Sequence, residues 1–220
     1  MLRVGLTGDL GSGKSTVAKL FAERGAIILS SDEMARAMMQ PGEPVYAAIV
    51  ERFGREVVAA DGSLNRRELA RLAFSQGRTE NLDALNAIVH PAVLAEQARQ
   101  IAQLTASSPE AIVVVESALI FTTKHGLEGQ PWSQRFDRIV LVTAPEAQKI
   151  ERFVDRIAAG RVLSKEERAG LEADARRRLA MQAENAAHAA ECLVISNDDG
   201  LESLEKQVDA VWSKLREQKR

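Results

Sequence analysis

Residues 8–15, near the start of the chain, have the clearest capacity for chemistry. They read Gly-Asp-Leu-Gly-Ser-Gly-Lys-Ser, which matches G-x-x-x-x-G-K-[ST], and they follow a strand-like segment and open a helix-like one. Glycines let such a loop turn tightly, so that the backbone amides of Gly11, Ser12 and Gly13 point inward at phosphate. The alternative is an ordinary glycine-rich turn, which the complete match in this context disfavours. We therefore predict a binding site for the phosphates of ATP.

The end of this motif supplies charge and a metal ligand. Lys14 is predicted to neutralise the β- and γ-phosphates, which makes it a candidate catalytic residue. Ser15 is predicted to bind Mg²⁺ through its hydroxyl, and Thr16 to contact the nucleotide. The loop alone does not separate a kinase from a GTPase or a motor. The chain has no Asn-Lys-x-Asp guanine-reading motif, so a nucleotide-dependent switch is the weaker hypothesis.

Asp32 follows the second strand-like segment, within Ser-Ser-Asp-Glu at residues 30–33. In a parallel sheet the carboxyl ends of the strands face the ligand, so a carboxylate there can orient an incoming hydroxyl and accept its proton. The alternative is that Asp32 caps a helix beginning at Glu33, and Ser31 could equally be that cap.

The elements that position these residues are predicted from short apolar runs. Runs rich in β-branched residues indicate five buried parallel strands, with helical patterns between them. The five predicted strands lie at residues 3–7, 26–29, 111–115, 138–143 and 192–195. Together with the phosphate loop, they predict an α/β protein of the P-loop NTPase fold, with a parallel five-stranded sheet flanked by helices on both faces.

Two helical stretches exceed what this sheet requires, within a single domain of residues 1–220. We expect a core of residues 1–39, 109–149 and 186–220, and an acceptor-binding helical insertion at residues 40–108. Residues 150–185 are predicted to form a lid, with Gly160 and Gly170 interrupting its helices. Residues 122–136 are predicted to be a surface loop.

Composition narrows the partners and the compartment. The 29 Lys and Arg against 31 Asp and Glu give a net charge of −2, which favours a small-molecule acceptor over a nucleic acid. No apolar run is long enough to span a bilayer, so no membrane role is predicted. Cys192 is the single cysteine and no signal-peptide pattern precedes the first strand, which predicts a cytoplasmic protein. No pattern indicates an oligomeric state.

Several segments taken together resemble bacterial dephospho-coenzyme A kinase. They are Leu-Thr-Gly at 6–8 leading into the phosphate loop, Ser-Asp at 31–32 before Ala-Arg at 35–36, Pro-Gly at 41–42, Asp-Gly-Ser-Leu-Asn-Arg-Arg at 61–67, and His-Pro at 90–91. The resemblance covers nearly the whole chain. It implies that the chain phosphorylates the ribose 3'-hydroxyl of dephospho-coenzyme A with ATP and Mg²⁺, in the last step of coenzyme A biosynthesis. Another P-loop kinase acting on a nucleotide or metabolite is the alternative.

The resemblance also implies roles for single residues. Asp32 becomes the catalytic base, and Arg66, Arg67 and His90 lie where the acceptor would bind. For His90 the alternative is a packed histidine before a proline that shapes the start of a helix. Glu116 ends the third strand, where such enzymes place an acidic residue near magnesium, although a solvent-facing carboxylate is as good an interpretation.

Three further residues are candidates on the nucleotide side. Arg152 and Arg156 are four residues apart on a predicted helix and resemble lid arginines that clamp phosphate. The alternative for Arg156 is a solvated face paired with neighbouring carboxylates. Asn197 follows the last strand, where the adenine often binds, although an Asn-Asp-Asp-Gly turn explains it equally well. The chain departs from the family at Ala118, where relatives have proline, and at Thr122, where they have a carboxylate.

Overall fold

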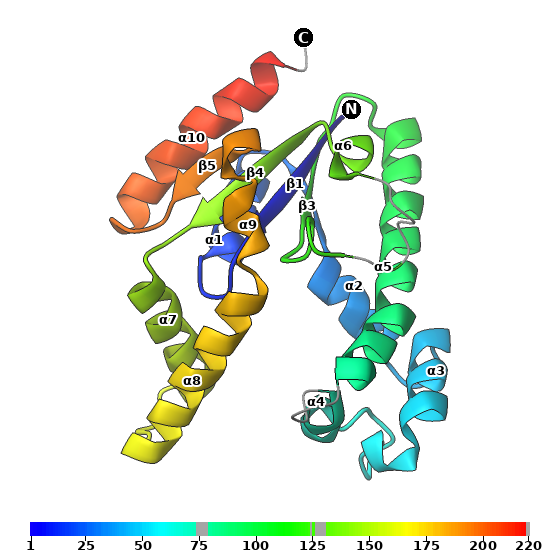
Figure 1. The fold of residues 1–220 in the computed structure, drawn as a ribbon. Coiled ribbons are helices and arrows are strands. Elements are labelled where there is room, and N and C mark those ends of the chain that lie inside the picture. Colours follow the sequence, from blue (N-terminus) through cyan, green and yellow to red (C-terminus); the bar gives the residue numbers. More distant parts are fainter. Residues whose placement is uncertain (74–78, 124, 126–130, 219–220) are drawn as a thin grey trace. The chain divides into compact units, whose positions relative to one another are not determined.

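A five-stranded sheet carries the fold (Figure 1). Its strands are β1 (Leu2–Gly8), β2 (Ile27–Ser30), β3 (Ile112–Glu116), β4 (Arg138–Thr143) and β5 (Leu193–Ser196). They lie in the order β2-β3-β1-β4-β5, and β1 runs parallel to β3 and β4, as β4 does to β5. The predicted five-stranded sheet is confirmed, with each strand within one residue of its expected bounds.

The computed structural model describes residues 1–73, 79–123, 125 and 131–218. Contacts within it divide the chain into two units. The first comprises Met1–Leu29, Leu104–Thr122 and Pro131–Arg220, and the second comprises Ser30–Gln103 and Thr123–Gln130. Across the described residues, no helix combines the length and the apolar character needed to cross a bilayer.

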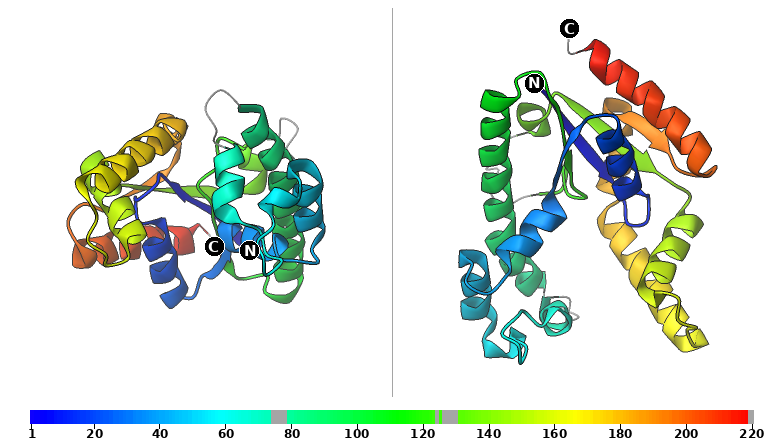
Figure 2. Two further views of the ribbon diagram at one scale, coloured as in Figure 1. Left: turned by 90° about the horizontal axis from the view of Figure 1, so that it is seen from below. Right: turned by 180° about the vertical axis from the view of Figure 1, so that it is seen from behind.

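One face of the sheet is covered by α1 (Lys14–Glu23) and α10 (Leu201–Glu217), which lie side by side (Figure 2). Branched strand residues such as Val4, Leu6 and Val114 meet Phe21 and Leu215 there, and all five are fully buried or nearly so. Packing the strand side chains against an apolar stripe on each helix removes apolar surface from water, which stabilises the fold. This cluster fixes the strand end from which the phosphate loop emerges.

On the other face of the sheet, two parts of the connection between β3 and β4 pack beside Gly5. Residues 122–136 were predicted to be a surface loop, but Trp132–Arg135 form the short helix α6 and Phe136 is buried, so this end of the segment is not a surface loop. Phe136 and Ile120 are buried beside Gly5, where an added Cβ would lie 2.7 Å from Ile120 Cδ1. The apolar side chains draw this connection onto the sheet because leaving them in water is unfavourable.

The predicted lid region, residues 150–185, lies mostly in two helices of the first unit, and two short elements follow them. They are α7 (Glu146–Ala158), α8 (Lys165–Met181), α9 (Glu184–Ala187) and the 3₁₀ turn η2 (Ala189–Glu191). Gly160 has a φ of +82° and lies between α7 and α8, as predicted. Gly170, however, lies inside α8 without interrupting it, because one glycine costs a helix only about 1 kcal/mol.

The second unit is helical. Its elements are α2 (Ser31–Met38), α3 (Pro44–Phe53), the 3₁₀ turn η1 (Arg55–Val57), α4 (Arg66–Ala73) and α5 (Thr79–Ser107), whose last turn belongs to the first unit. Ile49, Phe53 and Val57 form the centre of its own hydrophobic cluster, with Leu64 and Leu69. This cluster shares no residue with the one beneath α1 and α10.

Candidate active site

The phosphate loop joins β1 to α1, and its glycines are required by close contacts. At Gly11 the φ is +72°, and a Cβ would lie 2.2 Å from the carbonyl oxygen of Lys149. At Gly13 the φ is +94°, and a Cβ would lie 2.1 Å from Asn197 Nδ2. A larger residue at either position would be strained and would collide with a neighbour. The sequence pattern thus reflects steric demands made by α7 and by the residue after β5.

Hydrogen bonds inside the loop shape it for anions. Ser12 N donates to Asp9 O at 3.1 Å, and Thr16 N donates to Gly13 O at 3.1 Å. Lys14 Nζ donates to the carbonyl oxygen of Gly8 at 2.7 Å, which holds the ammonium group against the loop backbone. The amino end of α1 follows directly and adds a partial positive charge.

Two of the predicted nucleotide-side residues contact this loop. Asn197 is buried, and its Nδ2 donates to Ser12 O at 2.9 Å. Arg152 donates to Gly11 O at 3.4 Å and to Asn197 O at 3.0 Å, so it connects the loop to the residue after β5. The sequence analysis predicted that both residues lie on the nucleotide side. It did not predict that their side chains donate hydrogen bonds to the backbone of the loop.

A second set of loop contacts was missed by the sequence analysis. Lys149 Nζ lies 2.5 Å from Asp9 Oδ2, and Asn185 Nδ2 donates to Asp9 Oδ1 at 3.0 Å. Leu10 N donates to Gln182 Oε1 at 2.7 Å. The only signal for these contacts in the sequence was Asp9, a carboxylate at the second position of a phosphate-binding motif. A carboxylate placed there needs a partner that neutralises its charge.

Ser15 and Glu116 form the part of the site that fits a metal ion. Ser15 Oγ donates to Glu116 Oε1 at 2.8 Å, because the register of β1 with β3 pairs Leu6 with Glu116 just below the loop. A hydroxyl and a carboxylate are the hard oxygen ligands that Mg²⁺ prefers, together with water and phosphate. The described residues include no group of three His, Cys, Asp or Glu placed to hold a metal by themselves.

Asp32 lies in the first turn of α2, and its side chain is exposed. The helix is capped instead by Ser30, whose Oγ accepts from Glu33 N at 3.3 Å. The alternatives that Asp32 or Ser31 caps the helix are therefore wrong. Ser31 is buried and its Oγ accepts from Gln97 Nε2 at 2.8 Å, which ties α2 to α5.

Arg66 and Arg67 begin α4 and are both exposed. The turn before them is well fixed: Asn65 Oδ1 accepts from Glu68 N at 3.1 Å, and Tyr46 Oη donates to Gly62 O at 2.6 Å. The pair of guanidinium groups is thus presented from a rigid helix start within the second unit.

His90 lies inside α5, because the helix continues through Pro91. The alternative that this proline shapes the start of a helix is therefore wrong. The His90 ring lies 6.3 Å from the ring of His125, and its buried Nδ1 has no hydrogen-bond partner within the described part of the chain. Burial, and then the nearby His125, lower the pKa of His90 below its ordinary value.

Arg156 is exposed near the end of α7, and its guanidinium lies 5.8 Å from the centre of the Phe153 ring. Over the residues that the structure describes, Arg156 makes no ion pair with the carboxylates of its own helix, which was the alternative to a phosphate contact. Phe153 belongs to a small cluster of α7 and α8 side chains that also contacts Leu10 of the phosphate loop.

The two departures from the family pattern lie in a segment stabilised by aromatic contacts. Phe121 stacks on His188 with ring centres 4.1 Å apart, and Trp132 meets Phe121 edge-on. Thr122 Oγ1 is buried without a hydrogen-bond partner among the described residues. This stacking connects the segment after Glu116 to the end of α9.

Proteins similar to this chain were found both by sequence and by fold. The family model described as dephospho-CoA kinase matches residues 2–203. A dephospho-CoA kinase of Streptomyces avermitilis is 39% identical over 217 residues, which are 98% of this chain and 94% of that protein.

Two solved structures are also similar. A Thermus thermophilus protein is 31% identical, with a TM-score of 0.68 and coverage of 97% of each chain. A dephospho-CoA kinase from Campylobacter jejuni has a TM-score of 0.59 at 19% identity, over 97% of this chain and 96% of that one, and so shows likeness of fold.

Proposed function

This chain belongs to the dephospho-CoA kinase family, and we propose that it transfers the γ-phosphate of ATP to the ribose 3'-hydroxyl of dephospho-coenzyme A. The products are coenzyme A and ADP, in the last step of coenzyme A biosynthesis. The observation that carries the proposal is the 2.8 Å contact between Ser15 and Glu116 beside a complete phosphate loop. These two oxygen ligands suit a site for ATP with magnesium.

Ser15 would bind the metal through its hydroxyl, and Glu116 beside it would interact with the water molecules that the metal carries. When bound, Mg²⁺ would neutralise charge on the β- and γ-phosphates as the transfer proceeds. Gly11, Ser12, Gly13 and Thr16 would bind the phosphates through backbone amides, and Lys14 would add its charge. Asn197 is proposed to contact the nucleotide base.

Asp32 is proposed to be the general base. Its carboxylate is exposed and does not cap α2, so it keeps its capacity to accept a hydrogen bond from the acceptor hydroxyl. In this role it orients the hydroxyl oxygen toward phosphorus and takes the proton as the new bond forms. Orientation of this kind supplies much of the acceleration in phosphoryl transfer.

Arginines are proposed to bind the remaining charge. Arg66 and Arg67, presented from the start of α4, would bind acceptor phosphates, and His90 would contribute to the same binding region. Arg152 and Arg156 would bind the transferring phosphoryl group, with residues 150–185 acting as a lid that excludes water. Residues 40–108 are proposed to be the acceptor-binding insertion of a single kinase domain.

The reaction is proposed to take place in the cytoplasm with small molecules as the only substrates. Cys192 is the single cysteine, so the chain forms no internal disulfide and suits a reducing compartment. The net charge of −2 gives no general attraction for nucleic acid.

The test is acceptor-dependent formation of ADP. The wild-type chain with Mg²⁺ and ATP should release ADP when dephospho-coenzyme A is added, and a nucleoside monophosphate should not replace it. Asp32→Asn should bind ATP almost normally while turnover falls by about two or more orders of magnitude.

Glu33→Gln is the matched control, since Glu33 is the next residue and an equally exposed carboxylate in the first turn of α2. It should retain turnover within about threefold of the wild type. Full activity in Asp32→Asn would exclude the assignment of the base. Turnover of a nucleoside monophosphate but not of dephospho-coenzyme A would exclude the proposed acceptor.

A further inference from the structure

The phosphate loop contains a carboxylate that by itself opposes its function. Asp9 is the second residue of the motif, and its single negative charge equals the positive charge of Lys14 within residues 8–15. A loop whose formal charges sum to zero attracts a polyphosphate less than one with a net positive charge. Asp9 therefore needs a dedicated counter-charge if the loop is to bind ATP well.

Lys149 provides that counter-charge at close range. Its Nζ lies 2.5 Å from Asp9 Oδ2, and the two side chains are only 13% and 19% exposed. The other oxygen, Asp9 Oδ1, accepts from Asn185 Nδ2 at 3.0 Å, and Asn185 is 1% exposed. Both carboxylate oxygens are thus engaged by groups outside the loop, in a partly dehydrated setting where charge interactions are strong.

The same contact fixes the loop in space. Lys149 belongs to α7, and its carbonyl oxygen is the atom that leaves no room for a side chain at Gly11. On the same side, Gln182 accepts from Leu10 N, and the Leu10 side chain joins the α7–α8 cluster. The ion pair therefore lies within a continuous contact between the loop and the lid helices.

On the premise of the proposed function, we propose that Lys149 is a positioning residue that neutralises Asp9 and so makes the phosphate loop able to bind a nucleoside triphosphate. With Lys149 included, the charges of Asp9, Lys14 and Lys149 sum to +1. Without it, Asp9 is a partly buried carboxylate that has lost the cation 2.5 Å from its Oδ2, and it repels the phosphates that Lys14 attracts.

The experiment is a double-mutant cycle on nucleotide affinity. Binding of the non-hydrolysable β,γ-imido analogue of ATP, with Mg²⁺, is measured by calorimetry for the wild type, Lys149→Met, Asp9→Asn and the double variant. Lys149→Met should weaken binding by about tenfold to a hundredfold. Asp9→Asn should stay within about threefold of the wild type, and adding it to Lys149→Met should restore affinity to within about fivefold.

A merely structural clamp would behave differently. Asp9→Asn would then weaken binding as much as Lys149→Met does, and the double variant would bind no better than either, which would overturn the proposal. If Lys149→Met does not fold, the comparison of Asp9→Asn with the double variant still decides: once the carboxylate is gone, loss of Lys149 should cost less than about threefold. A larger loss there would equally overturn it.

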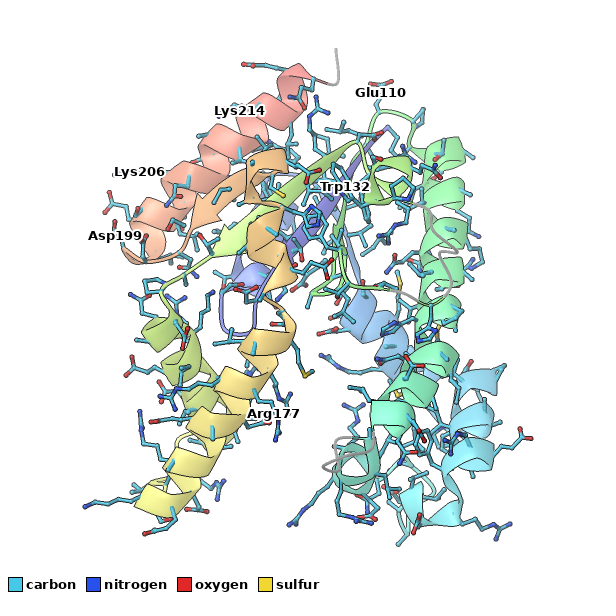
Figure 3. The ribbon with its side chains drawn as sticks, viewed as in Figure 1. Glu110, Trp132, Arg177, Asp199, Lys206 and Lys214 are labelled. Carbon is cyan, nitrogen blue, oxygen red and sulfur yellow. The ribbon has the colours of Figure 1, made fainter. Side chains whose placement is uncertain are left out.

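Lys206→Met is the matched control. Lys206 projects from α10, is 74% exposed and pairs only with Glu202 on its own helix (Figure 3). Lys206→Met should leave the affinity for the analogue unchanged. Such a result would show that the weaker binding of Lys149→Met does not follow from the loss of just any lysine. A wild-type chain that binds the analogue but yields no ADP with dephospho-coenzyme A would contradict the proposed function alone, because the ion pair acts on nucleotide affinity.

Discussion

A carboxylate that follows a strand directly can serve either the next helix or a ligand, and the local backbone decides which. Here α2 begins at Ser31, and Ser30 supplies the capping oxygen. Asp32 is then two positions beyond the cap, and the capping hydrogen bond is made by Ser30 instead. A difference of two residues in where a helix starts thus decides whether the carboxylate can act in catalysis.

Gly11 offers a test of the steric origin of the phosphate loop. Gly11→Ala places a methyl group 2.2 Å from the backbone oxygen of Lys149 while also requiring a φ of +72°. We expect a loss of about 2 to 4 kcal/mol in the free energy of unfolding, measured by urea denaturation, with weaker binding of the ATP analogue.

Gly25→Ala separates backbone strain from collision. Gly25 has a φ of +96° but no atom within 4 Å of an added Cβ. This variant should lose only about 1 kcal/mol and should keep its affinity for the analogue. Equal losses in the two variants would show that contact with α7 does not constrain the loop.

His90 should make the stability of the fold depend on pH. Burial and His125 lower the pKa of His90 in the folded chain, whereas the unfolded chain has the ordinary value of 6.5. The unfolded state therefore binds the proton more readily. The contribution of the neutral ring is fully present above about pH 6.5 and is lost as the pH falls through the lower folded pKa.

The comparison is with His90→Gln, which does not titrate. Urea unfolding at a series of pH values between about 8 and about 5 should show the wild type losing stability relative to the variant, by at most about 1.4 kcal/mol per pH unit. Parallel curves for the two proteins would mean that the environment of His90 does not favour its neutral form. His125 and its partner Asp83 are present in both proteins, so the difference mainly reports His90.

At the scale of elements, α7 and α8, the helices of the proposed lid, are held together by few buried side chains. In the described structure, the cluster between α7 and α8 has only four buried members, which are Ile150, Phe153, Val154 and Ala175. Most ion pairs along α8 are exposed and contribute little. Local stability there depends on how α8 begins, which is a capping box of Ser164 and Glu167.

Ser164→Ala should loosen the start of α8. Ser164 Oγ accepts from Glu167 N at 3.1 Å, and loss of this bond should cost about 1 kcal/mol of local stability. Hydrogen exchange at the first-turn amides of α8 should then be about fivefold faster. Ser213→Ala on α10, where Ser213 Oγ only donates to the carbonyl of Asp209, should leave exchange in both helices almost unchanged. Equal effects would contradict the role of the cap.

At the scale of the whole molecule, each of the two units contains a hydrophobic cluster of its own among the described residues. Leu215 is fully buried in the core of the first unit and Ile49 in that of the second. Since the clusters share no residue, each unit has its own source of stability, and the units need not open together.

Matched truncations test this independence. Ile49→Ala and Leu215→Ala should each cost about 2 to 5 kcal/mol within their own unit. Hydrogen exchange analysed by mass spectrometry should show faster exchange mainly in residues 31–103 for Ile49→Ala, and mainly in the sheet and α10 for Leu215→Ala. Uniform acceleration across the chain in both variants would show that the two units unfold as one.

The sequence by itself determined what depends on contiguous residues. The phosphate-binding motif is complete in eight residues because its ligands are backbone amides of one turn. The strands were predicted to within a residue because each contains a short apolar run, which is longest where a central strand such as β3 is buried on both faces. The combination of short motifs was sufficient to indicate the family.

The tertiary structure alone decided what depends on residues far apart in the chain. Ser15 meets Glu116 across 101 positions because β1 and β3 are neighbours in register. Asp9 meets Lys149 across 140 positions and Asn185 across 176. No periodicity links such residues, since their contact depends on how strands and helices pack. The sequence therefore predicted which loop binds phosphate, and the fold brought Lys149 and Asn185 to the carboxylate within that loop.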